Sequence, residues 1–179
     1  MLTLQKKSRL YKNFFKLVFL IIIILVPLFW VCVQTNFDFF NSIGVSQSFT
    51  SYVSYKLSLM TRVFALFVSL IPTLAVLNII DLLIRLFSHY ENLEIFSSKV
   101  VYIYRNLGNA LVYWFIAKLI YGPLITLTLS YNNPPGERFI GVSIDTLDVL
   151  ALITGAIVIA IASVMQKAKE ISEENDLTI

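Results

Sequence analysis

Four polar side chains stand within long apolar stretches of this chain, where a charged or amide group needs a partner. Lys118 lies at the middle of the apolar run 107–129, and Asn78, Asp81 and Arg85 share one helical face in the run 63–87. A lone lysine at mid-membrane costs roughly 2.5 to 3.5 kcal/mol on insertion scales. Such a group marks a polar pathway or an essential pairing, or it is a snorkelling or structurally paired lysine, and the residue pattern alone leaves these alternatives open.

The spacing of these residues predicts an intramembrane polar cluster. On antiparallel helices rising about 1.5 Å per residue, Lys118 lies roughly 16 Å from Leu107, and Asp81 lies roughly 6 Å from Arg85. A side chain leans toward the N-terminus of its helix, so Lys118 reaches Asn78 directly and Asp81 through a water. Alternatively, Asp81 and Arg85 pair at i, i+4 and Asn78 bonds to a neighbouring helix, which requires no activity.

Four apolar runs must position these residues, and each has about the length of a transmembrane helix. They are residues 14–33, 63–87, 107–129 and 147–165. Of the 179 residues, 58% are hydrophobic and 14% charged, so no room remains for a soluble domain of ordinary size. We expect an all-α integral membrane protein, in which residues 1–179 form one antiparallel bundle of four transmembrane helices with a short tail, 166–179.

Basic residues are distributed unevenly between the two sides of this predicted bundle. Because Lys and Arg are enriched near the cytoplasmic ends of spans, we expect both termini to be cytoplasmic. The first span has a basic start but no small-residue cleavage site after it, so we expect it to remain as an anchor. Ten basic residues fall on the predicted inner side, namely Lys6, Lys7, Arg9, Lys12, Lys16, Arg85, Lys99, Arg105, Lys167 and Lys169, against Lys56, Arg62 and Arg138 outside.

Local patterns predict where the helices begin. Apolar residues recur at three- and four-residue steps from Phe49 to Met60, which predicts that the second helix starts near Ser48 and continues through Pro72. The segment 88–96 is polar and turn-like, and Ser97 or Ser98 can cap the third helix before its membrane span. For the fourth helix, we expect Asp145 at the N-cap and Asp148 in the first turn.

Small residues and the tail suggest two contact surfaces. On the fourth helix, small side chains at helical spacing predict a packing face inside the bundle; these are Ala151, Gly155, Ala156, Ala160 and Ser163. In the tail, Lys169 can pair with Glu173 along a helix that ends near Asn175. Apolar residues then stand on an acidic, exposed end, so we predict a partner-binding tail of Asp176, Leu177, Thr178 and Ile179.

Enzymatic function is not expected, and we predict no catalytic residue, cofactor or metal. The single histidine, His89, is interpreted as a solvated loop residue, and the single cysteine, Cys32, as a small apolar membrane residue. Neither metal-ligand spacing nor a glycine-rich phosphate loop occurs in the sequence. Direct nucleic-acid binding is not expected either, because the basic residues sit where the orientation rule places them.

Two segments of the chain resemble a known family. The run 82–110, LLIRLFSHYENLEIFSSKVVYIYRNLGNA, and the end, ITGAIVIAIASVMQKAKEISEENDLTI, are similar to domain-of-unknown-function family 2975, uncharacterised bacterial four-helix membrane proteins. The most specific parts are Ile95-Phe96-Ser97 and the closing run 174–179, while Glu94 stands where the family pattern often has glycine. The resemblance implies a multi-pass protein of a bacterial inner membrane. Members are commonly encoded beside a small helix-turn-helix regulator, so the resemblance also implies a cytoplasmic DNA-binding partner.

Two functions from different classes remain. In the first, the protein is a regulatory or interaction protein whose cytoplasmic hairpin and tail bind a partner. In the second, it is an accessory or core subunit of a membrane transport complex, and the Lys118 cluster faces a polar path. We favour the first, because the tail and the extended helix ends offer a binding surface. The expected partners are membrane lipids with a cytoplasmic regulator or, in the second case, other membrane subunits; the sequence does not predict the oligomeric state.

Overall fold

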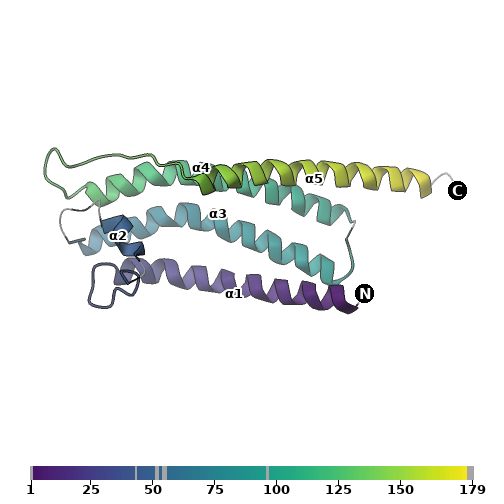
Figure 1. Cartoon of the computed structure of the whole chain (residues 1–179), viewed down its shortest axis with the longest axis horizontal. Coiled ribbons are helices and arrows are strands. Elements are labelled where there is room, and N and C mark those ends of the chain that lie inside the picture. Colours follow the sequence, from purple (N-terminus) through teal and green to yellow (C-terminus); the bar gives the residue numbers. More distant parts are fainter. Residues whose placement is uncertain (1, 43, 51–52, 54–55, 96, 177–179) are drawn as a thin grey trace. The chain divides into compact units, whose positions relative to one another are not determined.

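The computed structural model describes residues 2–42, 44–50, 53, 56–95 and 97–176, and the regular structure in them is entirely helical (Figure 1). The helices are α1 (Leu2–Cys32), α2 (Val45–Thr50), α3 (Leu59–Glu91), α4 (Ser98–Ser130) and α5 (Thr146–Asp176). All but α2 are long and apolar enough to cross a membrane. The predicted all-α class with four candidate transmembrane helices is therefore confirmed, and each predicted span lies within one helix except for Val33, which follows α1.

The contacts divide the helices into two compact units. The first unit comprises Met1–Leu20, Ala75–Phe115 and Thr146–Ile179, and the second comprises Ile21–Leu74 and Ile116–Asp145. The helices α1, α3 and α4 contribute residues to both units, whereas α5 belongs to the first unit alone. Each of the three shared helices contains one proline, Pro27, Pro72 or Pro123, and all three prolines belong to the second unit.

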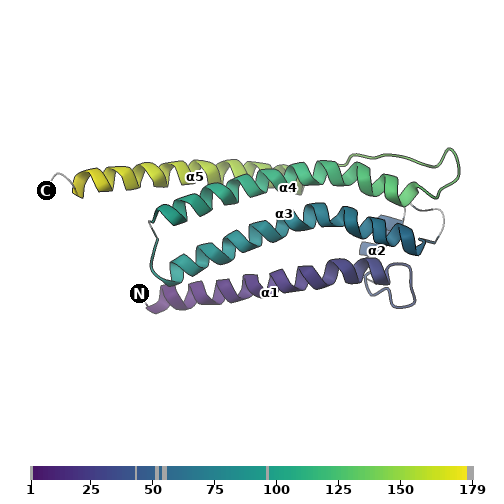
Figure 2. The same cartoon turned by 180° about the vertical axis from the view of Figure 1, so that it is seen from behind.

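In the first unit, neighbouring helices run antiparallel, as the contacts between their ends show. The start of α1 contacts the end of α3, where Arg9 and Lys12 bind Glu91. The end of α5 meets the start of α4, where the Lys169 ammonium contacts the Ser98 hydroxyl. Figures 1 and 2 show these helix ends side by side from opposite directions. The buried core between the helices consists of Leu82, Leu86, Val100, Ile103, Leu107 and Ala110.

The backbones of α4 and α5 approach each other closely at two glycines of the first unit. A Cβ atom on Gly108 would lie 2.4 Å from Ile159 Cγ1 and 2.8 Å from the Gly155 carbonyl oxygen. A Cβ on Gly155 would lie 2.9 Å from the Gly108 carbonyl oxygen. The predicted packing face is thus confirmed at Gly155. It is wrong for Ala156, Ala160 and Ser163, which are exposed.

The second unit has its own apolar core and the same antiparallel arrangement. Trp30, near the end of α1, donates from Nε1 to Ser69 Oγ of α3 at 2.9 Å. Asn132, just after α4, donates to the Thr61 hydroxyl at the start of α3 at 3.0 Å. The residues buried together in this core are Trp30, Val33, Leu57, Ala65, Ile125 and Leu129.

The prediction of a continuous helix from Ser48 through Met60 is wrong. The short helix α2 ends at Thr50, and α3 begins only at Leu59. Two contacts explain the break. The backbone N–H of Leu57 donates to Gln34 Oε1 at 2.7 Å instead of to a helical carbonyl, and Ser58 Oγ accepts from the Thr61 N–H at 3.1 Å, which caps α3.

Most of the other predicted helix ends agree with the structure. Ser97 Oγ accepts from the Val100 N–H at 3.3 Å and so caps α4. Asp145 directly precedes α5, and Asp148 in the first turn is buried. The turn after α3 begins later than predicted, because the helix continues to Glu91 and closes at Leu93, whose φ of 62° is left-handed.

Candidate functional site

The predicted polar cluster falls on both units. Lys118 belongs to the second unit, whereas Asn78, Asp81 and Arg85 belong to the first. In the first unit, Arg85 Nε donates to Asp81 Oδ2 at 2.8 Å, the ion pair expected from the i, i+4 spacing. Asn78 and Arg85 are exposed, and Asp81 is half-buried. Contact of Lys118 with these residues stays a prediction.

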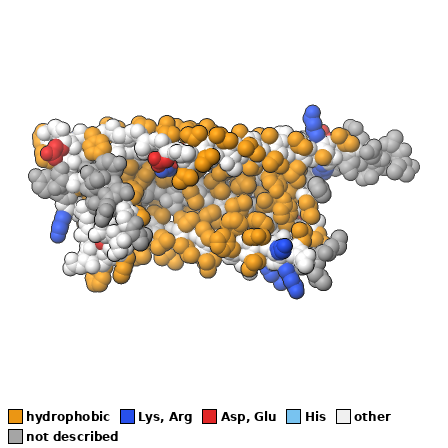
Figure 3. Space-filling view, viewed as in Figure 1, with side chains coloured by type: hydrophobic (Ala, Val, Ile, Leu, Met, Phe, Trp, Pro, Cys, Tyr) orange, Lys and Arg blue, Asp and Glu red, His pale blue; other side chains and the backbone are white. Residues whose placement is uncertain are grey.

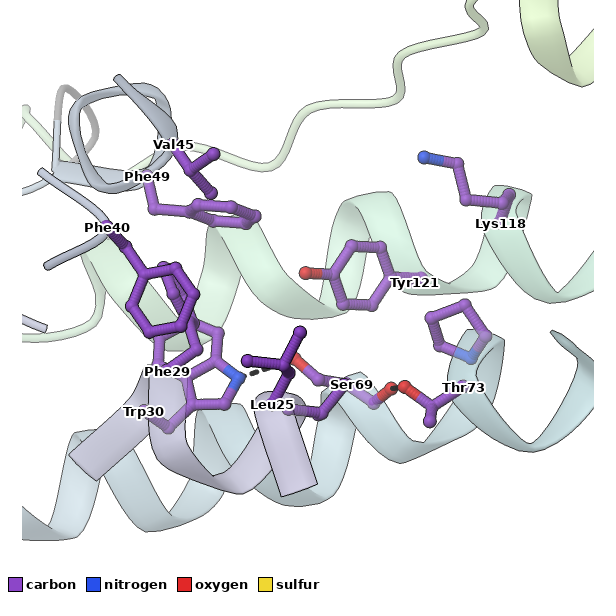
Figure 4. A pocket seen from close by; sticks show the side chains of 12 residues that line it. Leu25, Phe29, Trp30, Phe40, Val45, Phe49, Ser69, Thr73, Lys118 and Tyr121 are labelled. Atoms are coloured by element: carbon purple, nitrogen blue, oxygen red, sulfur yellow. Dashed lines mark hydrogen bonds between the residues drawn. The ribbon is translucent and has the colours of Figure 1, made fainter. Parts of the chain in front are cut away.

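Lys118 lines a cavity of about 440 Å³ in the second unit (Figure 4). The walls come from α1, α2, α3 and α4, together with Phe40 of the loop between α1 and α2. Figure 4 shows the Lys118 and Tyr121 side chains extending from α4 toward the end of the cavity that the aromatic rings occupy. Within its own unit, Lys118 forms neither an ion pair nor a hydrogen bond with any residue that the structure describes, so its charge faces the cavity uncompensated there.

Aromatic rings form one end of this cavity. The ring of Phe29 packs against those of Trp30, Phe40 and Phe49, with centroids 5.0, 5.2 and 5.3 Å away. Trp30 is 3% exposed, and its N–H is satisfied by Ser69. The hydroxyl of Thr73 donates to the Ser69 carbonyl oxygen at 2.6 Å, one turn earlier in α3. The cavity therefore has an aromatic end, and the ammonium group of Lys118 and the phenol group of Tyr121 extend toward it from α4.

Asp38 fixes the loop that brings Phe40 and α2 to the cavity. Its carboxylate accepts hydrogen bonds from the Gln34 N–H at 2.9 Å, the Asn41 N–H at 3.1 Å and the Ser46 hydroxyl at 2.7 Å. Neither Asp38 nor the aromatic cluster is among the site residues predicted from the sequence. The density of aromatic residues between Phe29 and Phe49 is the signal that could have indicated them.

A second candidate surface lies where the ends of α1, α3, α4 and α5 meet in the first unit. Glu91 is 15% exposed at its side chain and accepts from Arg9 Nε at 2.7 Å and also from the Lys12 ammonium. His89 lies in the last turn of α3, not in a loop as predicted, and its Nδ1 is 2.7 Å from Glu94 Oε2. Among the described residues, no group of three or more His, Cys, Asp or Glu side chains could hold a metal ion.

The end of α5 continues past its contact with α4. Beyond Lys169, which binds Ser98, the helix runs from Glu170 to Asp176, about 10 Å at 1.5 Å per residue. Figures 1 and 2 both show this end projecting beyond the start of α4. Ile171 on this projection is 59% exposed. Of the predicted partner-binding tail, Asp176 ends α5, whereas Leu177, Thr178 and Ile179 lie outside the described residues, as do the side chains from 172 onward, which include Glu173.

A groove of about 310 Å³ between α4 and α5 adjoins this projection. Its rim includes Tyr102, which is 66% exposed, together with Arg105 and Lys169. Arg105 donates to Gln166 Oε1 at 2.6 Å, which ties the two helices together beside the groove. Figure 3 shows apolar side chains over much of the visible helical surface, with Lys and Arg side chains near the start of α1 and near the end of α5.

Comparison with known proteins identifies a family but no individual related protein. A family model described as protein of unknown function (DUF2975) matches residues 52–179, which include α3, α4 and α5 but not α1 or α2. Neither a curated protein nor a solved structure matches the chain. The match is consistent with a multi-pass membrane architecture and assigns no chemistry to the residues described above.

Proposed function

The chain belongs to the DUF2975 family, and we propose that it is a non-enzymatic regulatory protein of a bacterial inner membrane that binds a cytoplasmic partner. In this proposal the four long helices anchor the protein. The ends of α4 and α5 in the first unit, with the tail, form the partner surface. The partner class implied by the family resemblance is a helix-turn-helix regulator.

The distribution of basic residues supports a cytoplasmic orientation of this surface. The ten basic residues assigned to the inner side all belong to the first unit, and Lys56, Arg62, Lys118 and Arg138 belong to the second. Parts of the chain that are far apart in sequence thus carry their basic residues in one unit, namely the first half of α1, the end of α3, the start of α4 and the end of α5. The positive-inside rule favours the cytoplasm for such a charged end.

The observation that carries the proposal is the projection of α5. A helix that ended with the bundle would stop near Lys169, where α5 meets the first residue of α4. Instead it continues for about 10 Å and exposes Ile171. Ile171 lies beside a groove whose rim combines the exposed Tyr102 with Arg105, and aromatic and arginine side chains are enriched in protein interfaces, which supports a partner surface here.

Copurification with matched variants tests the proposal. Tagged full-length protein is extracted from bacterial membranes in mild detergent, and cytoplasmic proteins bound to it are quantified against the bait. We expect a bound regulator with the wild type, and a loss of about tenfold or more with a chain lacking residues 171–179. The Ile171→Ser variant removes one exposed apolar side chain and should weaken the same interaction.

Phe39→Ser is the matched control, because Phe39 is 72% exposed but belongs to the second unit. It should retain the regulator at the wild-type level. If the truncated chain keeps every partner at full strength, the tail has no part in binding and the proposal fails. Recovery of a larger membrane assembly, independent of the tail, would favour the alternative function as a subunit of a transport complex.

A further inference from the structure

We propose that the cavity around Lys118 is a binding site for a single-chain amphiphile with an anionic head group, such as a carboxylate. The inference stands apart from the partner surface, because every residue that lines this cavity belongs to the second unit. It concerns the chemistry of the cavity alone.

The polar groups of the cavity favour an anion. Among the residues that line it, Lys118 supplies a cation and no acidic side chain is present. The Lys118 ammonium offers three N–H donors, and the Tyr121 hydroxyl, which interacts with Ser69, lies one helical turn further along α4. Since no described acceptor in the second unit engages Lys118, a bound carboxylate would supply the missing partner and form a charge-assisted hydrogen bond.

The remaining wall favours an apolar body attached to that head group. Phe29, Trp30, Phe40 and Phe49 present ring faces and edges, and Leu25 and Val45 add aliphatic surface. A volume of about 440 Å³ is near the lower end of the range for small-molecule sites, which suits one alkyl chain better than a phospholipid with two.

The position of the walls favours the bilayer as the source of the ligand. Apart from Phe40, Val45 and Phe49, every lining residue lies in one of the predicted transmembrane spans. A ligand that reaches such a site from the membrane must have an apolar body. One that stays beside Lys118 must compensate its charge, because an isolated ammonium is costly in an apolar setting.

Quenching of Trp30 fluorescence by brominated amphiphiles tests this site. The chain has two tryptophans, so a Trp114→Phe background leaves Trp30, in the cavity wall, as the only indole. Purified protein in a neutral detergent is titrated with a fatty acid brominated on its chain, and separately with the corresponding fatty alcohol. Bromine quenches the indole on contact, so the dependence on mole fraction measures occupancy of the cavity.

We expect saturable quenching by the acid, with about tenfold weaker binding of the alcohol, a difference of about 1.4 kcal/mol. Lys118→Met should abolish the preference for the acid, and Lys118→Arg should keep it. Lys56→Met removes a lysine of the same unit that does not line the cavity, and it should behave as the parent. Quenching that never saturates, equal affinity for acid and alcohol in the parent, or an unchanged preference in Lys118→Met would each overturn the proposal.

Discussion

Glu91 joins two helices through one carboxylate. Arg9 and Lys12 stand on the same face of α1, and both reach Glu91 at the end of α3, so three charges meet at one helix pair. The carboxylate is largely shielded from water, whereas Arg9 is 70% exposed at its side chain. Removal of the carboxylate would leave Lys12, whose side chain is 20% exposed, as the most poorly compensated member of the group.

We expect Glu91→Ala to lower the melting temperature clearly, because the carboxylate that joins α1 to α3 is lost and Lys12 keeps its charge without this partner. Thermal unfolding of the detergent-purified protein measures the change. Glu94→Ala is the comparison, because Glu94 is 45% exposed and contacts His89, so its loss should cost about 0 to 1 kcal/mol. Equal effects of the two variants would contradict the assigned importance of Glu91.

Lys118 differs from Glu91 in having no described partner within its unit. Lys118→Met keeps the length of the side chain and removes the charge, and it breaks no hydrogen bond or ion pair among the described residues of that unit. We therefore expect the melting temperature of the detergent-purified protein to stay the same or to rise. A marked fall would instead indicate that Lys118 takes part in a stabilising contact, as in the predicted cluster with Asn78 and Asp81.

At this scale, the sequence predicted the residues that act on near neighbours in the chain. The i, i+4 pair of Asp81 and Arg85 and the cap at Ser97 each depend on a few consecutive residues. The contacts of Glu91 with α1, and of Gln34 with Leu57, join residues far apart in the sequence. No local periodicity encodes such contacts, so they became visible only in the folded chain.

The α4–α5 pair depends on the absence of side chains at its crossing. We expect Gly108→Ala and Gly155→Ala each to force the helices apart and to destabilise the protein by about 1 to 3 kcal/mol, as overpacking does. Gly122→Ala is the matched control in α4, because its Cβ would meet no atom nearer than 3.4 Å. It should be neutral or stabilising through better helix propensity.

Thermal unfolding again gives the measurement, and a chemical cross-link between α4 and α5 could report their separation directly. If Gly108→Ala were as well tolerated as Gly122→Ala, the close approach of the two backbones would not be a determinant of stability.

The long helices show how far a sequence pattern can predict a structural element. Hydropathy identified all four long helices, but the periodicity after Phe49 did not reveal that Ser58 starts α3 anew.

For the whole molecule, the property to be measured is its orientation in the membrane, that is, which side of the membrane each terminus and loop faces. From the ten-to-three distribution of basic residues, we expect reporters fused after Ile179 and within Asn92–Ser97 to be cytoplasmic. Reporters near Asn41 and Gly136 should be external. A C-terminal fusion on the external side would reverse the assignment and place the α5 projection outside the cytoplasm, where no regulator could bind it.

The three long helices that line the Lys118 cavity each contain one proline, namely Pro27, Pro72 or Pro123. Each proline deprives its helix of one backbone hydrogen bond, at the carbonyl groups of Ile23, Val68 and Leu119. Each of the three long helices that line the cavity thus has a turn weakened by proline in the second unit, whereas α5 contains no proline. Bending of the helices at these turns can therefore widen the cavity, so a ligand can enter without a movement of the loop between α1 and α2.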